Sequence, residues 1–217
     1  YINLRLGDYP LGLKQLFEAL PIIEPLQEDR GLADVYDSIT GIYHHIGNYP
    51  EALDIAYKQL RAAQRAGDMQ RVANANNNLS AIYFETGDQE KSKETLQSNL
   101  LMAKDIGHTR IECLTYINLA YYFLSVGEEK TAVKNGLLGL QVSRDCGYEM
   151  FEIHALHILG RSYQKTSCYD QALAHLEEAA DRSRALGTKV TEILVLQTQG
   201  EVFRDMRQVE RAKECLN

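Results

Sequence analysis

The sequence of 217 residues contains no tryptophan, only 4 prolines and only 4 cysteines. Few prolines leave long stretches free to form helices, because proline interrupts a helix interior. No apolar run approaches the roughly 20 residues that cross a bilayer, so we expect no membrane partner. The formal net charge is −7, whereas phosphate binding needs a concentrated basic surface. We therefore expect no nucleic acid as a partner.

The cysteines match neither a zinc spacing nor a disulfide framework. Cys113 and Cys146 occupy positions that are small or apolar elsewhere in the chain, which predicts that both lie in the core. Cys168 is predicted to lie in an exposed turn. Free thiols fit a reducing compartment, and we expect a cytoplasmic protein. His154 and His157 lack a third ligand at helical spacing, so no metal site is predicted.

Glycine recurs in this chain at a fixed interval. Two evenly spaced series, in which each position number is 40 higher than the one before, alternate along the sequence: Gly7, Gly47, Gly87 and Gly127, and then Gly67, Gly107, Gly147 and Gly187. Ser167 and Arg207 continue the first series without glycine. Two turn signals in each interval leave room for two helices, which predicts an array of helix pairs.

We predict one array over residues 1–217, with partial repeats at both ends. The repeats are 1–30, 31–70, 71–110, 111–150, 151–190 and 191–217. Within 31–70, the first helix is predicted from about Gly31 to Ile46, and the second from Pro50 to about Ala66. Because the chain begins inside a repeat, we expect it to be a piece of a longer protein.

The predicted ends of the array are expected to expose apolar side chains. The residues expected to be incompletely covered are Leu13, Leu16 and Leu20 at one end, and Val202 and Phe203 at the other. A repeat array without a polar cap exposes its apolar interior. The fragment is therefore predicted to self-associate through its incomplete ends.

Each repeat places a large aliphatic residue, a small residue and an aromatic residue at the same positions. Leu159, Gly160 and Tyr163 form one such set, and the small Ala172 is predicted to face it from the partner helix. Small residues let two helix backbones approach while a ring fills the space beside them. This pattern predicts close antiparallel helix pairs.

These recurring positions resemble the tetratricopeptide repeat, whose pattern is a bulky residue, Leu-Gly, Tyr, a turn with Gly and Tyr, and then Ala. Tyr36, Tyr116 and Leu156 match the bulky position, whereas Asn76 departs from it and Gln199 interrupts the aliphatic column. The 40-residue form resembles repeats of kinesin light chains, of Rap-type regulators and of bacterial signalling proteins. The resemblance implies an all-α right-handed superhelical solenoid and a binding module.

One stripe of the first helices is predicted to face the groove of such an array. Asn78 and Asn118 are predicted to pair with the backbone of an extended peptide, because a carboxamide both donates and accepts hydrogen bonds. Other members would select charge or offer apolar contact, although these asparagines could instead link adjacent repeats. The predicted peptide-binding residues are Asp34, Asp37, Asn74, Asn77, Asn78, Asn118, Tyr121, His157 and Arg161.

Three functions are compatible with the sequence. The first is binding of a peptide segment of a partner protein, within the regulatory part of a bacterial signalling protein. The second is a structural or dimerisation array that positions an output domain. The third is a small-ligand sensor, which would need an enclosed pocket. No phosphate-binding loop, nucleophile elbow or metalloprotease motif is present, so neither an enzyme activity nor a cofactor is predicted.

Overall fold

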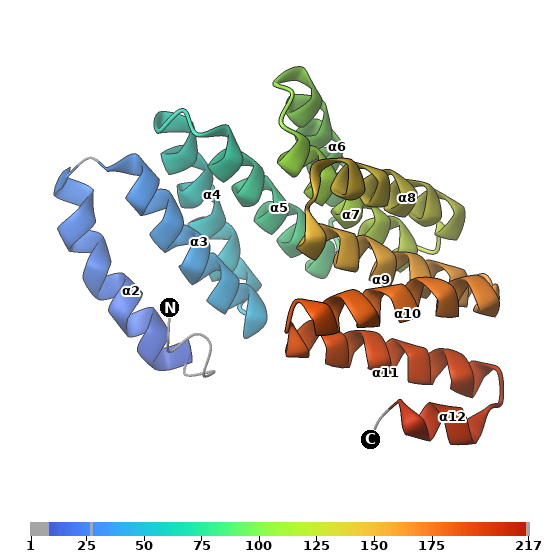
Figure 1. The fold of residues 1–217 in the computed structure, drawn as a ribbon. Helices are drawn as coiled ribbons and strands as arrows, with labels where there is room; N and C mark the ends of the chain where they lie inside the picture. Colours follow the sequence, from blue (N-terminus) through green and yellow to red (C-terminus); the bar gives the residue numbers. More distant parts are fainter. Residues whose placement is uncertain (1–8, 27, 216–217) are drawn as a thin grey trace. The chain divides into compact units, whose positions relative to one another are not determined.

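The computed structural model describes residues 9–26 and 28–215, and all of their regular structure is helical. The chain divides into two compact units, Tyr1–Asn99 and Leu100–Asn217, here called the N-terminal and the C-terminal unit. The boundary lies inside a single helix, α6 (Figure 1). The N-terminal unit contains α2 (Tyr9–Ile23), η1 (Glu24–Leu26), α3 (Asp29–His45), α4 (Tyr49–Arg65), α5 (Met69–Glu85) and the first part of α6 (Gln89–Asp105). The C-terminal unit contains the end of α6 and then α7 (Thr109–Ser125), α8 (Glu129–Cys146), α9 (Glu149–Lys165), α10 (Tyr169–Ala185), α11 (Lys189–Asp205) and α12 (Val209–Glu214).

The predicted all-α fold of antiparallel helix pairs is confirmed. For the repeat 31–70, the two helices begin slightly earlier than predicted, at Asp29 and Tyr49. Pro50 lies in the first turn of its helix, where its fixed φ helps and its missing N–H is not needed. Within the N-terminal unit α3 packs against α4, and within the C-terminal unit α7 packs against α8 and α9 against α10.

A left-handed residue ends most of these helices. Gly47 has a φ of 76°, and its N–H donates to the carbonyl oxygen of His44. The other described glycines of the two series also have positive φ, while Gly7 lies outside the described residues. Ser167 and Arg207 adopt the same conformation with a side chain, which costs roughly 1–2 kcal/mol relative to glycine. The turn geometry is therefore kept even where glycine is absent.

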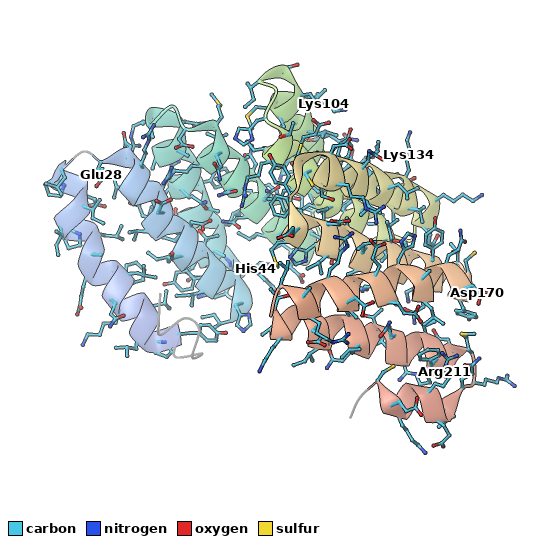
Figure 2. The ribbon with its side chains drawn as sticks, viewed as in Figure 1. Glu28, His44, Lys104, Lys134, Asp170 and Arg211 are labelled. Atoms are coloured by element: carbon cyan, nitrogen blue, oxygen red, sulfur yellow. The ribbon has the colours of Figure 1, made fainter. Side chains whose placement is uncertain are left out.

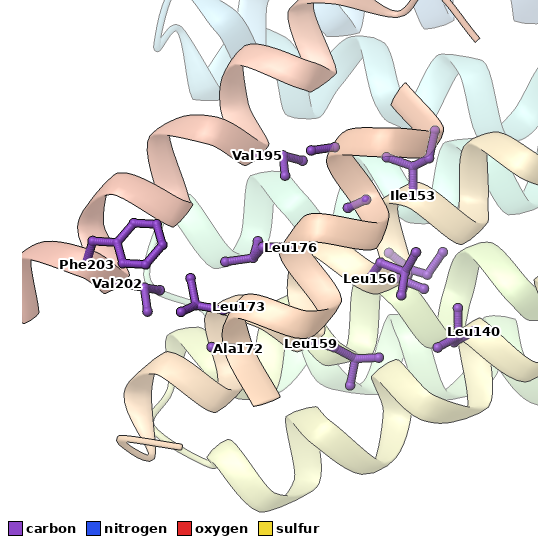
Figure 3. Close-up of a cluster of buried hydrophobic side chains, with 14 of the residues drawn as sticks. Leu140, Ile153, Leu156, Leu159, Ala172, Leu173, Leu176, Val195, Val202 and Phe203 are labelled. Carbon is purple, nitrogen blue, oxygen red and sulfur yellow. The ribbon is translucent and has the colours of Figure 1, made fainter. Parts of the chain in front are cut away.

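The small residues of the repeat pattern lie where helices touch. Figure 3 shows the core of the C-terminal unit, which includes Leu159 of α9 and Leu176 of α10. A Cβ added to Gly160 would come within 2.5 Å of the Cγ of Leu176, which is fully buried. In the N-terminal unit the small Ala52 of α4 packs in a cluster with Leu79 and Ile82 of α5. Close approach of the helices thus requires the small residue.

The cysteine predictions are only partly confirmed. Cys113 is buried and Cys168 is exposed, as predicted, whereas Cys146 is exposed and the prediction for it was wrong. Cys146 is the last residue of α8 and directly precedes the left-handed Gly147. At this position the helix is leaving the core, so a small or apolar residue there does not indicate burial.

The prediction that Val202 and Phe203 are incompletely covered was also wrong. Both are buried, because α12 packs against α11 and the Arg211 guanidinium lies 4.3 Å from the centre of the Phe203 ring. Figure 2 shows Arg211 on this short last helix. The exposed apolar side chains of α11 are instead near its start and include Val190 and Ile193.

Candidate binding faces on the first helices

The first helices of successive repeats lie beside one another within each compact unit. In the N-terminal unit α3 contacts α5, and in the C-terminal unit α9 contacts both α7 and α11. The predicted site residues therefore form two sets, which are described separately. The α3–α5 face consists of Asp34, Asp37, Asn74, Asn77 and Asn78, and the α7–α9 face consists of Asn118, Tyr121, His157 and Arg161.

Asn78 and Asp37 share a hydrogen-bond network with Gln59 of α4. The Asn78 amide donates to Asp37 Oδ1 at 2.8 Å and to Gln59 Oε1 at 3.0 Å. Gln59 Nε2 donates to the same Asp37 oxygen at 2.8 Å, and this glutamine is fully buried. The network connects α3, α4 and α5, and it uses both amide hydrogens of Asn78. The Asn78 carbonyl oxygen accepts no hydrogen bond from the described residues.

The two aspartates of the α3–α5 face differ in their charge partners. Asp34 accepts hydrogen bonds from Arg71 at 2.8 and 2.6 Å, and Arg71 also pairs with Asp68. Hydrogen bonding to Asp34 raises the pKa of Arg71 further above its ordinary range. Asp37 forms no ion pair with any residue in the described part of the chain. The charge of Asp34 is thus matched inside the protein, and that of Asp37 is not.

The remaining asparagines of the α3–α5 face have different surroundings. Asn77 Oδ1 accepts from Asn99 of α6 at 3.3 Å, while the buried Asn77 Nδ2 has no partner among the described residues. Asn99 is fully buried and also donates to the carbonyl oxygen of Ala73. Asn74 is half-buried, and its side chain makes no hydrogen bond to the described residues. Asn77 therefore links two helices, whereas Asn74 does not.

Sequence reasoning missed Gln59 and Asn99, although both position the predicted residues. A signal was present, because these two residues occupy equivalent places on the second helices of successive repeats. The next members of the same column are the small residues Gly139 and Ala179. A large polar side chain in a column that is otherwise small indicates a buried hydrogen-bonded group.

On the α7–α9 face, Tyr121, His157 and Thr198 form a hydrogen-bonded chain across three helices. The Tyr121 hydroxyl lies 3.3 Å from His157 Nδ1, and His157 Nε2 lies 2.9 Å from the Thr198 hydroxyl. The Thr198 hydroxyl donates to the carbonyl oxygen of Leu194. Thr198 must therefore accept from His157 Nε2–H, which leaves Nδ1 to accept from Tyr121.

His157 is a neutral residue of this face at neutral pH. Burial lowers its pKa to about 4, and the positive charges of Arg161 and His154 act in the same direction. Burial thus favours the uncharged ring, and the role of His157 in selecting charge stays a prediction. Arg161 is exposed and forms no ion pair with the described residues, so it supplies the positive charge of the face.

Asn118 contributes a carboxamide to the α7–α9 face. It is half-buried on α7, and its side chain makes no hydrogen bond to the described residues. Tyr121 lies one turn further along the same helix face. Burial raises the pKa of the Tyr121 hydroxyl, which therefore stays protonated at neutral pH. The two residues place an unused amide beside a fixed aromatic ring.

Two hollows in the C-terminal unit contain none of the predicted site residues. One, of about 420 Å³, is lined by residues that include Tyr148 and Phe151, and the other, of about 340 Å³, lies beside Phe203 and Arg211. In residues 9–26 and 28–215 there is no group of three or more His, Cys, Asp or Glu side chains placed to bind a metal ion. In the same residues no helix is long and apolar enough to cross a membrane.

The described geometry defines a class of protein, an all-α array of helix pairs separated by left-handed turns. Within this class, residues 73–102 match the family model of the tetratricopeptide repeat. The predicted resemblance is confirmed, and the chain has the tetratricopeptide-repeat fold. No curated protein shows significant sequence similarity to the chain.

Solved structures with the same fold cover most of the chain. BtubC (BKLC) from P. vanneervenii is 16% identical, with a TM-score of 0.73, over 97% of this chain and 86% of that one. A Rap protein complexed with Competence and Sporulation Factor is 14% identical, with a TM-score of 0.74, over 99% and 70%. A putative kinesin light chain of Podosopora anserina is 14% identical, with a TM-score of 0.65, over 87% and 92%. At these identities the similarity concerns the fold.

Proposed function

We propose that the chain is a protein-interaction module that binds a peptide segment of a partner protein through its first-helix faces. The observation that carries the proposal is the α7–α9 face, where the unused carboxamide of Asn118 lies near a fixed network of Tyr121 and His157. An amide that has no partner among residues 9–26 and 28–215 can both donate to and accept from a peptide backbone.

Preorganisation supports this proposal. Tyr121 is held at its hydroxyl by His157, which is held in turn by Thr198 of the next first helix. Side chains that are already fixed lose less conformational entropy when a ligand binds. The exposed Arg161 adds a charge that a partner with an acidic group would match. The face thus combines an open amide, a rigid ring and a cation.

The α3–α5 face supports the same proposal in a different way. The network of Asn78 with Asp37 and Gln59 favours a structural role for the Asn78 amide, and leaves its carbonyl oxygen as an acceptor for a ligand. Both roles are compatible with peptide binding. One protein with a similar fold is a Rap protein in complex with Competence and Sporulation Factor. We extend from this the proposal that the chain is the regulatory part of a bacterial signalling protein.

A displayed library of short random peptides, selected on the wild-type chain, tests the proposal. The dissociation constants of the selected peptides would be measured for the wild type and for Asn118→Ala. We expect affinity to fall at least about tenfold, which corresponds to about 1.4 kcal/mol. The control is Gln171→Ala, which removes an exposed carboxamide from the second helix α10 of the same unit.

Two outcomes would contradict peptide binding at this face. One is that no peptide is enriched on the wild-type chain, which would favour the structural array. The other is that selected peptides bind Asn118→Ala and the wild type equally well. In the second case the hollow beside Tyr148 and Phe151 becomes the next surface to test.

A further inference from the structure

We infer that Asp37 is the subsite of the α3–α5 face that binds a positively charged side chain, lysine or arginine, of the partner peptide. The inference rests on the proposed function and names the chemistry of its ligand. It follows from a contrast among the acidic residues of the N-terminal unit. Asp29, Asp34 and Asp68 are paired with arginines, whereas Asp37 is held by two neutral amides.

Three other aspartates of the N-terminal unit are each paired with an arginine. Asp29 Oδ1 lies 2.6 Å from Arg65 Nη2, and Asp34 Oδ2 lies 2.6 Å from Arg71 Nη2. Asp68 pairs with Arg71 at 2.7 Å and lies 3.6 Å from Arg30. Each of these charges is compensated inside the unit, so none of them needs a ligand.

Asp37 is held in place without being neutralised. Its Oδ1 accepts from Gln59 Nε2 and from Asn78 Nδ2, both at 2.8 Å, and the whole residue is half-buried. Two donors from two different helices fix the plane of the carboxylate. Neutral donors stabilise its charge only partly, and a cation that reaches the second oxygen would form a charge-assisted hydrogen bond.

The neighbouring acceptor favours the same ligand. The Asn78 carbonyl oxygen accepts no hydrogen bond from the described residues, and its amide group is anchored on Asp37 and Gln59. Ammonium and guanidinium groups have several N–H donors and no acceptor. The Asp37 carboxylate and the Asn78 carbonyl oxygen are both acceptors, and hydrogen bonds hold both side chains in place. Together they therefore match a basic side chain better than an acidic or apolar one.

The test is a nuclear magnetic resonance titration of the full chain with capped Gly-Gly-Arg-Gly-Gly and Gly-Gly-Lys-Gly-Gly peptides. The control peptide has citrulline, which has the shape of arginine without its charge. We expect the basic peptides to shift the side-chain amide signals of Asn78 and Gln59, and citrulline to leave them unchanged. Asp37→Asn should abolish these shifts while its carbonyl oxygen still accepts from Gln59 and Asn78.

A matched variant separates this effect from a general change of charge. Asp54→Asn removes the same charge from an exposed position on α4, and its shifts should equal those of the wild type. Equal shifts with arginine and citrulline peptides, or none with any peptide, would overturn the inference. The dispersion of the backbone signals shows whether each variant is folded.

The library selection distinguishes failure of this inference from failure of the proposed function. Selected peptides should contain a basic residue, and Asp37→Asn should weaken their binding at least about tenfold. Peptides that lose affinity with Asn118→Ala but not with Asp37→Asn would refute the Asp37 subsite and leave peptide binding intact. If no peptide is enriched, peptide binding fails, and the titration with the arginine peptide still decides whether Asp37 binds a cation.

Discussion

Two glycines inside first helices differ in what surrounds them. A Cβ at Gly160 would come within 2.5 Å of Leu176, whereas a Cβ at Gly41 would meet nothing within 4 Å. Both residues lie in helix interiors, where alanine is favoured over glycine by up to about 1 kcal/mol. Packing therefore opposes the replacement of glycine by alanine at Gly160, but not at Gly41.

We predict opposite effects of these two substitutions on stability. Gly160→Ala should lower the free energy of unfolding by about 1 to 2 kcal/mol, because overpacking a tight core outweighs the gain in helix propensity. Gly41→Ala should raise it by up to about 1 kcal/mol. Urea unfolding of both variants measures the effects. A Gly160→Ala protein as stable as the wild type would show that α9 and α10 can separate without cost.

At the residue scale, the sequence predicted the turns and the small packing positions. It did not predict the exposure of every residue that occupies the same position in successive repeats. The turn glycines and Gly160 follow from backbone geometry, which repeats with the sequence. Cys146 misled the prediction because its column, with Ile106 and Leu186, is apolar and exposed. Composition alone does not show that these residues lie where a helix ends.

At the scale of helices, the link between Asp37, Gln59 and Asn78 connects a complete helix pair to the next first helix. Gln59 is fully buried, so each of its polar atoms needs a partner. Asn78 supplies the donor to its carbonyl oxygen. The link thus stabilises the packing of α3, α4 and α5 whether or not a ligand is bound.

Asn78→Ala is therefore predicted to destabilise the protein by about 1 to 2 kcal/mol, because it leaves the buried Gln59 carbonyl oxygen without its donor. Asn74→Ala, on the same helix face, should change stability by less than about 0.5 kcal/mol, because Asn74 makes no side-chain hydrogen bond to the described residues. Thermal unfolding of the two variants distinguishes these values. Equal stability of both would indicate that the link contributes nothing.

The asparagines show where prediction from the sequence ends at this scale. Helical periodicity placed Asn74, Asn77 and Asn78 on one face, and the helix bounds bear this out. It could not show that Asn78 donates to Asp37, or that Asn77 accepts from Asn99. Such contacts depend on side-chain rotamers of residues on different helices. Whether the asparagines bind a peptide stays a prediction.

At the scale of the whole molecule, burial of histidine couples stability to pH. The pKa of His157 falls from an ordinary value of 6.5 to about 4, and burial also lowers the pKa values of His154 and His175. Between these two pH values, the unfolded chain binds a proton at His157 that the folded chain does not bind. The contribution of His157 to stability is therefore greatest above about pH 6.5, and it falls as the pH falls towards 4.

We predict that the contribution of His157 alone lowers the free energy of unfolding by about 2 kcal/mol between pH 7 and about pH 5. His157→Gln keeps a side chain that can donate and accept but does not titrate, so its loss over the same range should be about 2 kcal/mol smaller. Urea unfolding of both proteins at the two pH values measures the difference. The same pH dependence in both would show that His157 is protonated in the folded state.

The uniform turn register has a consequence at the level of the gene. The turns at Gly67 and Gly107 have nearly the same φ, and each precedes a residue whose side chain accepts from the first turn of the next helix, Asp68 and His108. Recombination that deletes the part of the gene coding for residues 68–107 would join Gly67 directly to His108. The product would lose α5 and α6 but keep each remaining helix at its full length, with His108 as the cap at the junction. Descendants of such a gene can gain or lose whole helix pairs in one step, so their proteins would differ in length by whole multiples of the repeat.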